Sequence, residues 1–275
     1  MIDVNIRVYA NFVIPKILSV YMKISIITAT YNSSKTLRDT MESVLSQSFS
    51  DIEYIIVDGL SKDNTLDIVK EYEAKFKGRL RWISEKDNGI YDAMNKGILM
   101  ATGEVIGILN SDDLYLDNNV LQDIANAFDN QTDAVFSNLY FVKQEDTSQI
   151  VRVWKGSPYK SFVKGWHPAH PTFYVRKEVY NKYGIFDTSF EVSADFELML
   201  RLIEKEKIRT KYLNRYTIRM RVGGESTGSL RNIIKGNKNI FRAFKKNGIN
   251  VSYFYPVCRL TPKAIDLIKC KLHLK

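Results

Sequence analysis

The chain has few cysteines, no long apolar run and no glycine-rich loop at its start. Cys258 and Cys270 are its two cysteines and lack metal-ligand spacing, so neither a zinc site nor a disulfide framework is predicted. No apolar run reaches the roughly 18 residues that a membrane-spanning helix needs. We therefore expect a reducing, cytoplasmic setting and no transmembrane helix.

Charge is distributed unevenly along the chain, whose formal net charge is +9. Residues 207–275 carry 17 Lys and Arg against two acids, so the first 206 residues are net acidic. A basic tail suits an anionic surface, whereas an acidic body repels a phosphate backbone. We expect no nucleic-acid partner, and a peripheral position on the inner face of the cytoplasmic membrane is one use for the tail.

Three segments are expected. Residues 1–21 are a leader or precede the natural start, because Asp3 stands where a signal peptide needs positive charge and Met22 directly precedes a strand-like run. Residues 22–228 form the main domain. Residues 229–275 form a basic amphipathic extension whose one helical stripe either enters a membrane interface or packs on the domain. The stripe consists of Leu230, Ile233, Ile234, Asn237, Phe241 and Phe244.

The first half of the main domain alternates between short apolar runs and helical periodicity. The predicted strands are residues 24–28, 52–57, 80–83 and 105–109, separated by three predicted helices. Such alternation predicts an α/β fold, with a mostly parallel central sheet covered by helices on both faces. Further strands are predicted at 134–142, 150–154 and 212–220, and a helix at 194–205, on what we expect to be the acceptor side.

Acidic residues follow three of the predicted strands. Asp58 ends the second strand, Asp87 follows the third, and Asp112 and Asp113 follow the fourth, so they converge on one rim of the sheet. Two adjacent carboxylates can hold a hard divalent cation. The same pair is also common in turns and helix caps, so by itself it leaves both interpretations open.

Four motifs give the sequence a resemblance to a known family. They are ISIITATYN, IIVDGLSKDNT, EKDNGIYDAMNKGILMATGEVIGILNSDD and SADFELMLRL, in that order. With them the chain resembles the family 2 glycosyltransferases of GT-A fold, including bacterial capsule and exopolysaccharide enzymes, from Lys23 to about Gly228. The third motif looks closest to the colanic-acid-type branch.

The resemblance implies a nucleotide-diphosphate sugar donor. Thr30 and Tyr31 would lie beside the nucleotide, and Asp58 would read the base, uracil being the usual one, unless it only caps the turn before Gly59. Asp87 would contact the base or ribose.

At the acidic pair, the resemblance places Asp112 near the ribose or the metal. Asp113 would bind the metal itself, Mg²⁺ or Mn²⁺, with the donor diphosphate completing the shell.

Family 2 members invert the anomeric centre and need a carboxylate base for the acceptor hydroxyl. Asp195 matches that position, although Ala194 stands where many relatives have a second acid. The alternatives are an ordinary first-turn acid, or Glu197 as the base.

Three further residues are candidate substrate or diphosphate contacts. His170 is favoured over His167 for a pocket position, although loop histidines are often only hydrogen-bonded surface groups. Trp166 would stack on a sugar or pack in the core. Arg221 would clamp diphosphate or lie on a solvated strand edge.

The expected function is therefore inverting transfer of a hexosyl or N-acetylhexosaminyl group, from a UDP-sugar to a hydroxyl of a growing, polyprenyl-linked glycan in capsule, exopolysaccharide or O-antigen synthesis. A sugar nucleotidyltransferase normally has a glycine-rich loop after its first strand, where residues 29–32 have no glycine. A dehydrogenase would need a G-x-G-x-x-G motif after a strand. The remaining alternative is a non-catalytic nucleotide- or lipid-binding module.

Overall fold

The computed structural model describes residues 22–223, 230–253 and 255, so the expectations about residues 1–21 and the boundary after 228 lie outside the described residues. The strands are β1 (Ile24–Thr30), β2 (Ile52–Asp58), β3 (Leu80–Ser84), β4 (Val105–Ile108), β5 (Leu114–Tyr115), β6 (Ala134–Val142), β7 (Ile150–Trp154), β8 (Tyr174–Arg176) and β9 (Thr210–Arg221). The α-helices are α1 (Leu37–Leu45), α2 (Thr65–Glu73), α3 (Ile90–Met100), α4 (Val120–Ala127), α5 (Lys177–Tyr183), α6 (Ala194–Met199) and α7 (Leu230–Lys246).

All nine strands belong to one sheet of order β3-β2-β1-β4-β8-β6-β9-β5, with β7 also paired to β6. The pairs β1–β2, β1–β4 and β2–β3 are parallel, as predicted. In the second half β6 runs parallel to β9, whereas β8 is antiparallel to both β4 and β6. The predicted α/β fold with helices on both faces of the sheet is confirmed, but the sheet is mixed where a mostly parallel one was predicted, because β5, β7 and β8 pair antiparallel with their neighbours.

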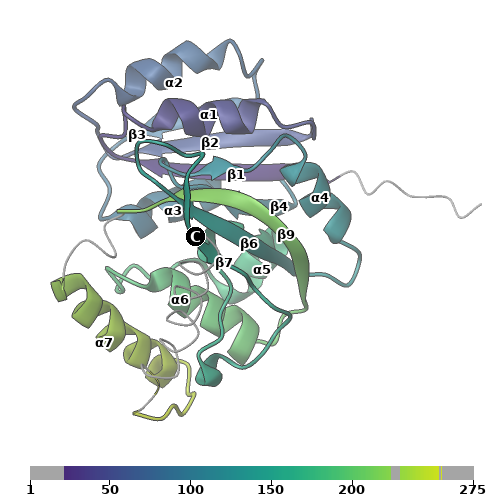
Figure 1. Cartoon of the computed structure of the whole chain (residues 1–275), viewed down its shortest axis with the longest axis vertical. Helices are drawn as coiled ribbons and strands as arrows, with labels where there is room; N and C mark the ends of the chain where they lie inside the picture. The colour runs from purple at the N-terminus through teal and green to yellow at the C-terminus, as the bar shows by residue number, and fades with distance from the viewer. Residues whose placement is uncertain (1–21, 224–229, 254, 256–275) are drawn as a thin grey trace, which may run out of the picture.

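Helices cover both faces of this sheet (Figure 1). One hydrophobic core lies against α1, α2 and α4, and the other against α3, α5, α6 and α7. Successive residues of β1 alternate between the two, since Ile26 belongs to the first core and Ile27 to the second. Gly97 allows α3 to lie close to β1, because a Cβ there would stand 2.3 Å from Ile27 Cγ2.

Four elements were not predicted, namely α4, α5, β5 and β8. All are short, at two to eight residues, so they offer little periodicity to detect. The predicted helix at 194–205 exists, but beyond Met199 it continues as a π-helix over Leu200–Lys205.

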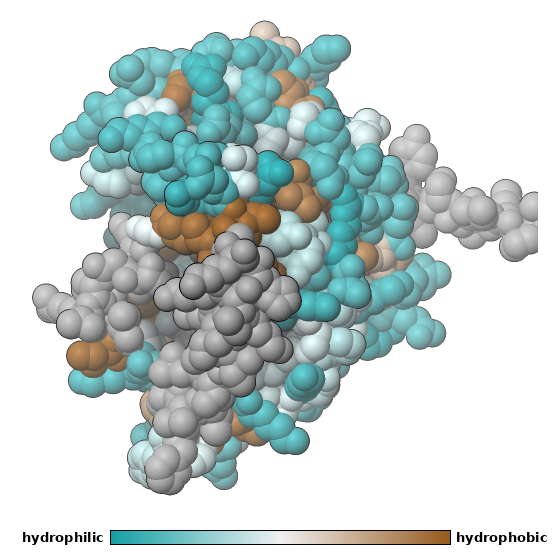
Figure 2. Space-filling view, in the orientation of Figure 1, coloured by the Kyte–Doolittle hydropathy of each residue, from teal (hydrophilic) through white to brown (hydrophobic). Residues whose placement is uncertain are grey.

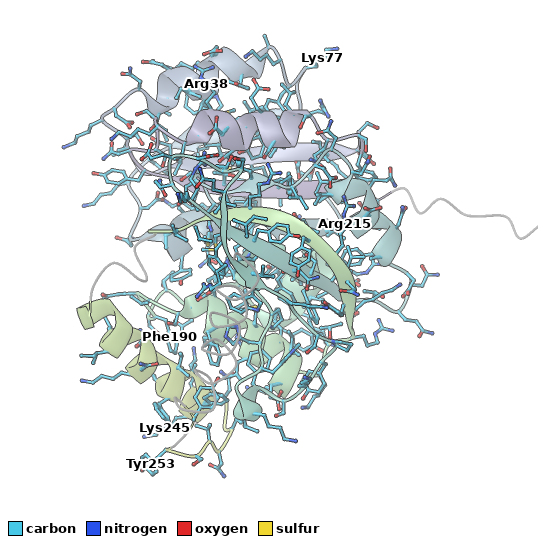
Figure 3. All side chains as sticks on the ribbon, in the orientation of Figure 1. Arg38, Lys77, Phe190, Arg215, Lys245 and Tyr253 are labelled. Carbon is cyan, nitrogen blue, oxygen red and sulfur yellow. The ribbon has the colours of Figure 1, made fainter. Side chains whose placement is uncertain are left out.

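The surface view is mostly hydrophilic, with hydrophobic residues gathered in a band across its middle (Figure 2). Polar contacts tie neighbouring helices together at this surface. Arg38 of α1, labelled in Figure 3, donates two hydrogen bonds to Glu71 of α2, at 2.8 and 2.6 Å. Within the described ranges, no helix is long and apolar enough to cross a membrane.

The extension helix α7 packs on the domain through part of the predicted stripe and through residues beside it. Phe244 of the predicted stripe is buried, whereas Ile234 of the same stripe is 58% exposed. Ile240 and Ala243, which lie outside the predicted stripe, are also buried. Tyr255 is buried too, and its ring meets that of Phe244 at 4.9 Å. For these residues the structure matches the packing alternative.

Candidate functional site

The carboxyl ends of β1 and β2 form the first part of the site, where Thr30 pairs with Asp58 in register. Both side chains are buried. The Asp58 carboxylate accepts hydrogen bonds from the Ser61 backbone N–H at 3.0 Å, from the Ser61 hydroxyl, and from Ser84 Oγ at 2.7 Å. Asp58 thus caps the turn after β2. A role toward a nucleotide base stays a prediction.

Asp87 lies against the same corner of the sheet. Its carboxylate would be 3.0 Å from a Cβ placed on Gly59, and the Tyr31 ring would be 3.5 Å from that atom. Lys96 of α3 donates to Asp87 Oδ1 at 2.7 Å and pairs with Glu85 at 2.8 Å. Tyr31 itself is 60% exposed, so its ring is available to a ligand that lies on this rim.

The loop of residues 110–113, which follows β4, is fixed by hydroxyl groups from β1 and α1. Thr28 Oγ1 donates to the carbonyl of Leu109 at 2.7 Å. Thr36 and Thr40 both donate to the carbonyl of Ser111, at 2.9 and 3.1 Å. These hydroxyl groups hold the backbone that presents Asp112 and Asp113.

Asp113 is completely buried at the end of this loop. Asn110 Nδ2 donates to its Oδ2 at 2.8 Å, while Oδ1 has no hydrogen-bond partner among the described residues. Burial, together with the charge of Asp112, holds the pKa of Asp113 well above its usual range. Burial also raises the pKa of Asp112, against the positive charge of Arg221.

An unpaired buried carboxylate oxygen is costly unless a cation or donor satisfies it. The acidic pair therefore fits a hard divalent cation. No group of three or more His, Cys, Asp or Glu that could hold a metal occurs in the described part of the chain. The remaining coordination positions would have to come from a ligand or from water.

Arg221 ends β9 beside this pair, and its guanidinium is committed to the protein. It donates to the carbonyl of Asp112 at 2.7 Å, to the carbonyl of Gln144 at 3.1 Å, and to Asp39 Oδ2 at 2.6 Å. The side chain is buried, so it does not lie on a solvated strand edge. In this arrangement Arg221 secures the loop of Asp112, and a diphosphate contact stays a prediction.

Asp195 lies in the first turn of α6. Ser193, the residue just before this helix, has a left-handed φ of 67°. Tyr91, near the start of α3, donates a hydrogen bond to Asp195 Oδ1 at 3.2 Å. His170 lies nearby, where burial lowers its pKa while the charge of Asp195 opposes that shift. Its ring meets the Phe186 ring edge-on at 5.7 Å.

The alternative candidates have structural partners. Glu197 is fully buried and accepts hydrogen bonds from Arg201 at 3.2 Å and Asn247 at 3.1 Å, which leaves it poorly placed as a base. The His167 ring packs edge-on against Trp154 and Phe196.

Trp166 lies in an aromatic cluster. Its ring packs against Phe136, Tyr159 and Phe162 at 5.3 to 5.7 Å, and its indole N–H donates to Ser157 Oγ at 3.1 Å. These contacts match the packing alternative for Trp166, and sugar stacking stays a prediction.

Basic residues of α7 hold the loop of residues 187–193 that leads into α6. Lys235 pairs with Glu191, Lys246 pairs with Asp187, and Arg242 donates to Ser189 O at 2.9 Å. Arg242 also lies 4.2 Å from the centre of the Phe190 ring, which sits between α7 and α6 in Figure 3. Three basic side chains of this helix therefore act within the protein, on the loop that precedes α6.

Three residues of α3 that the structure places at the site were not predicted from the sequence, namely Tyr91, Asn95 and Lys96. Tyr91 and Asn95 are four residues apart and so lie on one face of the helix. That spacing was the available signal in the sequence.

Comparisons with known proteins place this geometry in context. The model of the family described as Glycosyl transferase family 2 matches residues 25–192. An uncharacterized glycosyltransferase of Methanocaldococcus jannaschii is 28% identical over 207 residues, which are 71% of this chain and 70% of the relative. The putative glycosyltransferase EpsH of Bacillus subtilis is 32% identical over 146 residues, 51% of this chain but only 42% of EpsH.

Solved structures share the fold. S. aureus TarS 1–349 in complex with UDP-GlcNAc aligns with a TM-score of 0.61 at 21% identity, covering 82% of this chain and 65% of that one. The mannosyltransferase PcManGT from Pyrobaculum calidifontis, in complex with GDP-Man and Mn²⁺, aligns with a TM-score of 0.61 at 18% identity, covering 86% and 68%. The sheet and its helical layers are thus of the GT-A type.

Proposed function

This chain belongs to glycosyl transferase family 2, and we propose that it moves a sugar from a nucleotide diphosphate donor to an acceptor hydroxyl with inversion. One observation carries the proposal. The carboxylates of Asp58, Asp87, Asp112 and Asp113 follow parallel strands at one rim of the sheet, and Tyr91 links the α3 helix at that rim to Asp195. The rim is suited to binding the donor, and Asp195 is suited to accepting the proton of the acceptor hydroxyl.

The donor in our proposal is a UDP-sugar. Asp58 would accept a hydrogen bond from a ring N–H of the base, with Thr30 and Tyr31 beside the nucleotide and Asp87 at the base or ribose. The buried Thr30 Oγ1 has no hydrogen-bond partner among the described residues, so it has capacity for a ligand atom. The fold shared with TarS, which was solved with UDP-GlcNAc, supports this choice of donor.

A divalent cation, Mg²⁺ or Mn²⁺, would be held by Asp113, with Asp112 turned to the metal or the ribose. When bound, it would neutralise charge on the departing diphosphate. The unpartnered Oδ1 of Asp113 supports this role, as does the fold shared with PcManGT, which was solved with Mn²⁺. Asn110 holds the other oxygen of Asp113 and so fixes the direction of the free one.

Asp195 would accept the proton of the attacking hydroxyl while the bond from the anomeric carbon to the diphosphate breaks on the opposite face. The nucleotide diphosphate leaves with the bonding electron pair, and the acceptor oxygen takes its place on carbon. His170 would line the pocket beside Asp195. Trp166 would reach the sugar only if its packing changed. Arg221 would act by holding the loop of Asp112.

The acceptor in our proposal is a hydroxyl of a growing glycan, as the sequence motifs imply. A polyprenyl-linked acceptor at the inner membrane surface stays a prediction. The contacts of α7 with residues 187–193 take up three basic groups, Lys235, Arg242 and Lys246, that a lipid surface would otherwise attract.

Product identification tests the reaction class. The purified chain is incubated with UDP- and GDP-sugars, Mn²⁺ or Mg²⁺ and glycan acceptors, after a thermal-shift screen for metal-dependent donor binding. Release of nucleoside diphosphate with glycosylated acceptor is expected. Pyrophosphate with a nucleotide-linked product would instead indicate a nucleotidyltransferase, and binding without turnover a non-catalytic module.

A variant tests the metal role. Asp113→Asn should lose metal-dependent transfer while the thermal unfolding midpoint holds or rises, because the substitution removes a buried charge but keeps the shape. Full turnover by this variant would exclude Asp113 as the metal ligand.

A further inference from the structure

Tyr91 makes the hydrogen bond to Asp195 described above, and nothing in the family motifs assigned it a role. Its hydroxyl lies 3.2 Å from Asp195 Oδ1 across the interface between α3 and α6. We propose that Tyr91 is a positioning residue that holds the Asp195 carboxylate in the orientation needed to take the acceptor proton. This inference rests on the proposed transferase function.

The phenol ring is held in place by a rigid support. It stacks on Phe186 with ring centres 5.4 Å apart and planes at 29°. Asn95, one turn further along α3, binds the backbone of Phe186 from both directions, donating to its carbonyl at 2.9 Å and accepting from its N–H at 2.9 Å. Because Asn95 is itself buried, the position of the Tyr91 hydroxyl is well determined.

The hydroxyl has one available role toward the carboxylate, that of donor. Burial, and then the charge of Asp195, hold the pKa of Tyr91 well above its usual range, so the phenol stays protonated at any working pH. A hydrogen bond to a charged acceptor contributes more than one between neutral groups. The phenol therefore donates to Asp195 Oδ1 and holds that oxygen in place.

Other groups near Asp195 do not supply this contact. The half-buried His170 has a lowered pKa and interacts with Asp195 through its charge, without a hydrogen bond to the carboxylate among the described contacts. Glu197 on the same helix is paired with Arg201 and Asn247. On α7, Lys235 is paired with Glu191.

The position of Tyr91 on α3 also connects the proposed catalytic base, Asp195, with the rim of the sheet that would bind the donor. One residue further on, Asp92 accepts a hydrogen bond from the Asn88 backbone N–H at 2.9 Å, and Lys96 of the same helix binds Asp87. A single rigid helix therefore carries contacts to the donor-side loop and to the base. Tyr91 would hold the Asp195 carboxylate in a fixed position relative to the bound donor.

The test compares Tyr91→Phe, which keeps the stacked ring and removes only the hydroxyl, with Tyr72→Phe as matched control. The Tyr72 hydroxyl donates to Glu42, between α2 and α1. For Tyr91→Phe we expect kcat to fall about 10-fold or more, with the donor KM within about twofold of the parent. A fall in kcat without a matching change in the donor KM indicates lost positioning of the base, since general loosening of the fold would also weaken donor binding. Tyr72→Phe should leave kcat and the donor KM unchanged.

Two outcomes would overturn the proposal. One is a Tyr91→Phe enzyme whose kcat equals that of the parent. The other is an equal loss of kcat in Tyr72→Phe, which would indicate a general effect of removing a tyrosine hydroxyl.

The contact can also be tested without turnover. A double-mutant cycle of Tyr91→Phe and Asp195→Asn, read from urea midpoints, should be non-additive if the two side chains interact. If the parent transferred no sugar from any donor, the proposed function would fall, and additive midpoints in this cycle would separately overturn the Tyr91 contact.

Discussion

Replacing Arg221 with alanine separates two roles that the sequence left open for this residue. The structure gives its guanidinium three protein acceptors, of which the carbonyl of Asp112 alone belongs to a residue that is not exposed. Leaving a buried carbonyl unpaired costs about 1–3 kcal/mol. Gln144 is exposed, so water can replace the bond to its carbonyl.

The ion pair with Asp39 adds little to this sum. The Asp39 side chain is 56% exposed, and exposed pairs contribute about 0–1 kcal/mol. We therefore expect Arg221→Ala to lower the free energy of unfolding by about 2–3 kcal/mol, and Asp39→Asn by less than about 1 kcal/mol. At roughly 2–4 °C per kcal/mol, the first variant should melt about 5–10 °C lower and the second less than about 4 °C lower.

The assay is thermal and urea unfolding of both variants, together with the donor KM for transfer. A structural Arg221 lowers stability first, and it weakens donor use only as far as the loop of Asp112 relaxes. If Arg221→Ala melted within about 1 °C of the parent while the donor KM rose more than 10-fold, the guanidinium would act directly on the diphosphate, and our reasoning from its protein contacts would be wrong.

Three further predictions follow from other parts of the fold. Burial alone would raise the pKa of Glu53, but its hydrogen bonds outweigh burial and lower the pKa to about 2. The carboxylate therefore stabilises the fold above pH 4.5, and this stabilisation is lost as pH falls toward 2. Glu53→Gln should therefore cost at most about 3 kcal/mol at pH 7, and urea titrations should show the difference shrinking between pH 4.5 and 2; a constant difference would contradict this. Gly107→Ala should cost about 1–3 kcal/mol in the same assay, because the new Cβ would stand 2.1 Å from Tyr174 Cε1; an unchanged urea midpoint would show that the ring moves freely. Arg242→Ala should lower kcat several-fold, because it loosens the loop of residues 187–193 that precedes Asp195. Substitution of the exposed neighbouring residue, Lys245→Ala, should not lower kcat. Equal kcat values for the two variants would refute this role of α7.

The strands and the acidic rim could be predicted from sequence because both depend on short-range signals. Residues 134–142 and 150–154 are uniform enough in β-branched and aromatic content for β6 and β7 to be predicted to the residue. Asp58 and Asp112 follow buried strands, and parallel strands end at one rim, so the carboxylates had to converge.

Contacts between residues far apart in the sequence were harder to predict. Arg221 was recognised as a candidate, but its acceptors lie 182, 109 and 77 residues away along the chain. No local pattern indicates such partners. The same holds for Tyr91 and Asp195, which are 104 residues apart.

The buried face of α7 was predicted only in part, for a related reason. Phe244 belongs to the predicted stripe and packs against Phe196, whereas Ile234 of that stripe is exposed and Ile240, outside it, is buried. Which of two amphipathic faces is buried depends on the surface that receives it, and that surface comes from another part of the chain.

The measurement that tests the central claim most directly is donor binding and transfer by Asp195→Asn, side by side with the parent. The parent should release nucleoside diphosphate from its preferred nucleotide sugar in the presence of a divalent metal and a glycan acceptor. The variant should bind the same donor with a Kd within about twofold, yet transfer about 10²–10⁴-fold more slowly, because it has lost only the group that takes the proton. Transfer by Asp195→Asn at the parental rate would contradict the assignment of Asp195 as the base of this reaction.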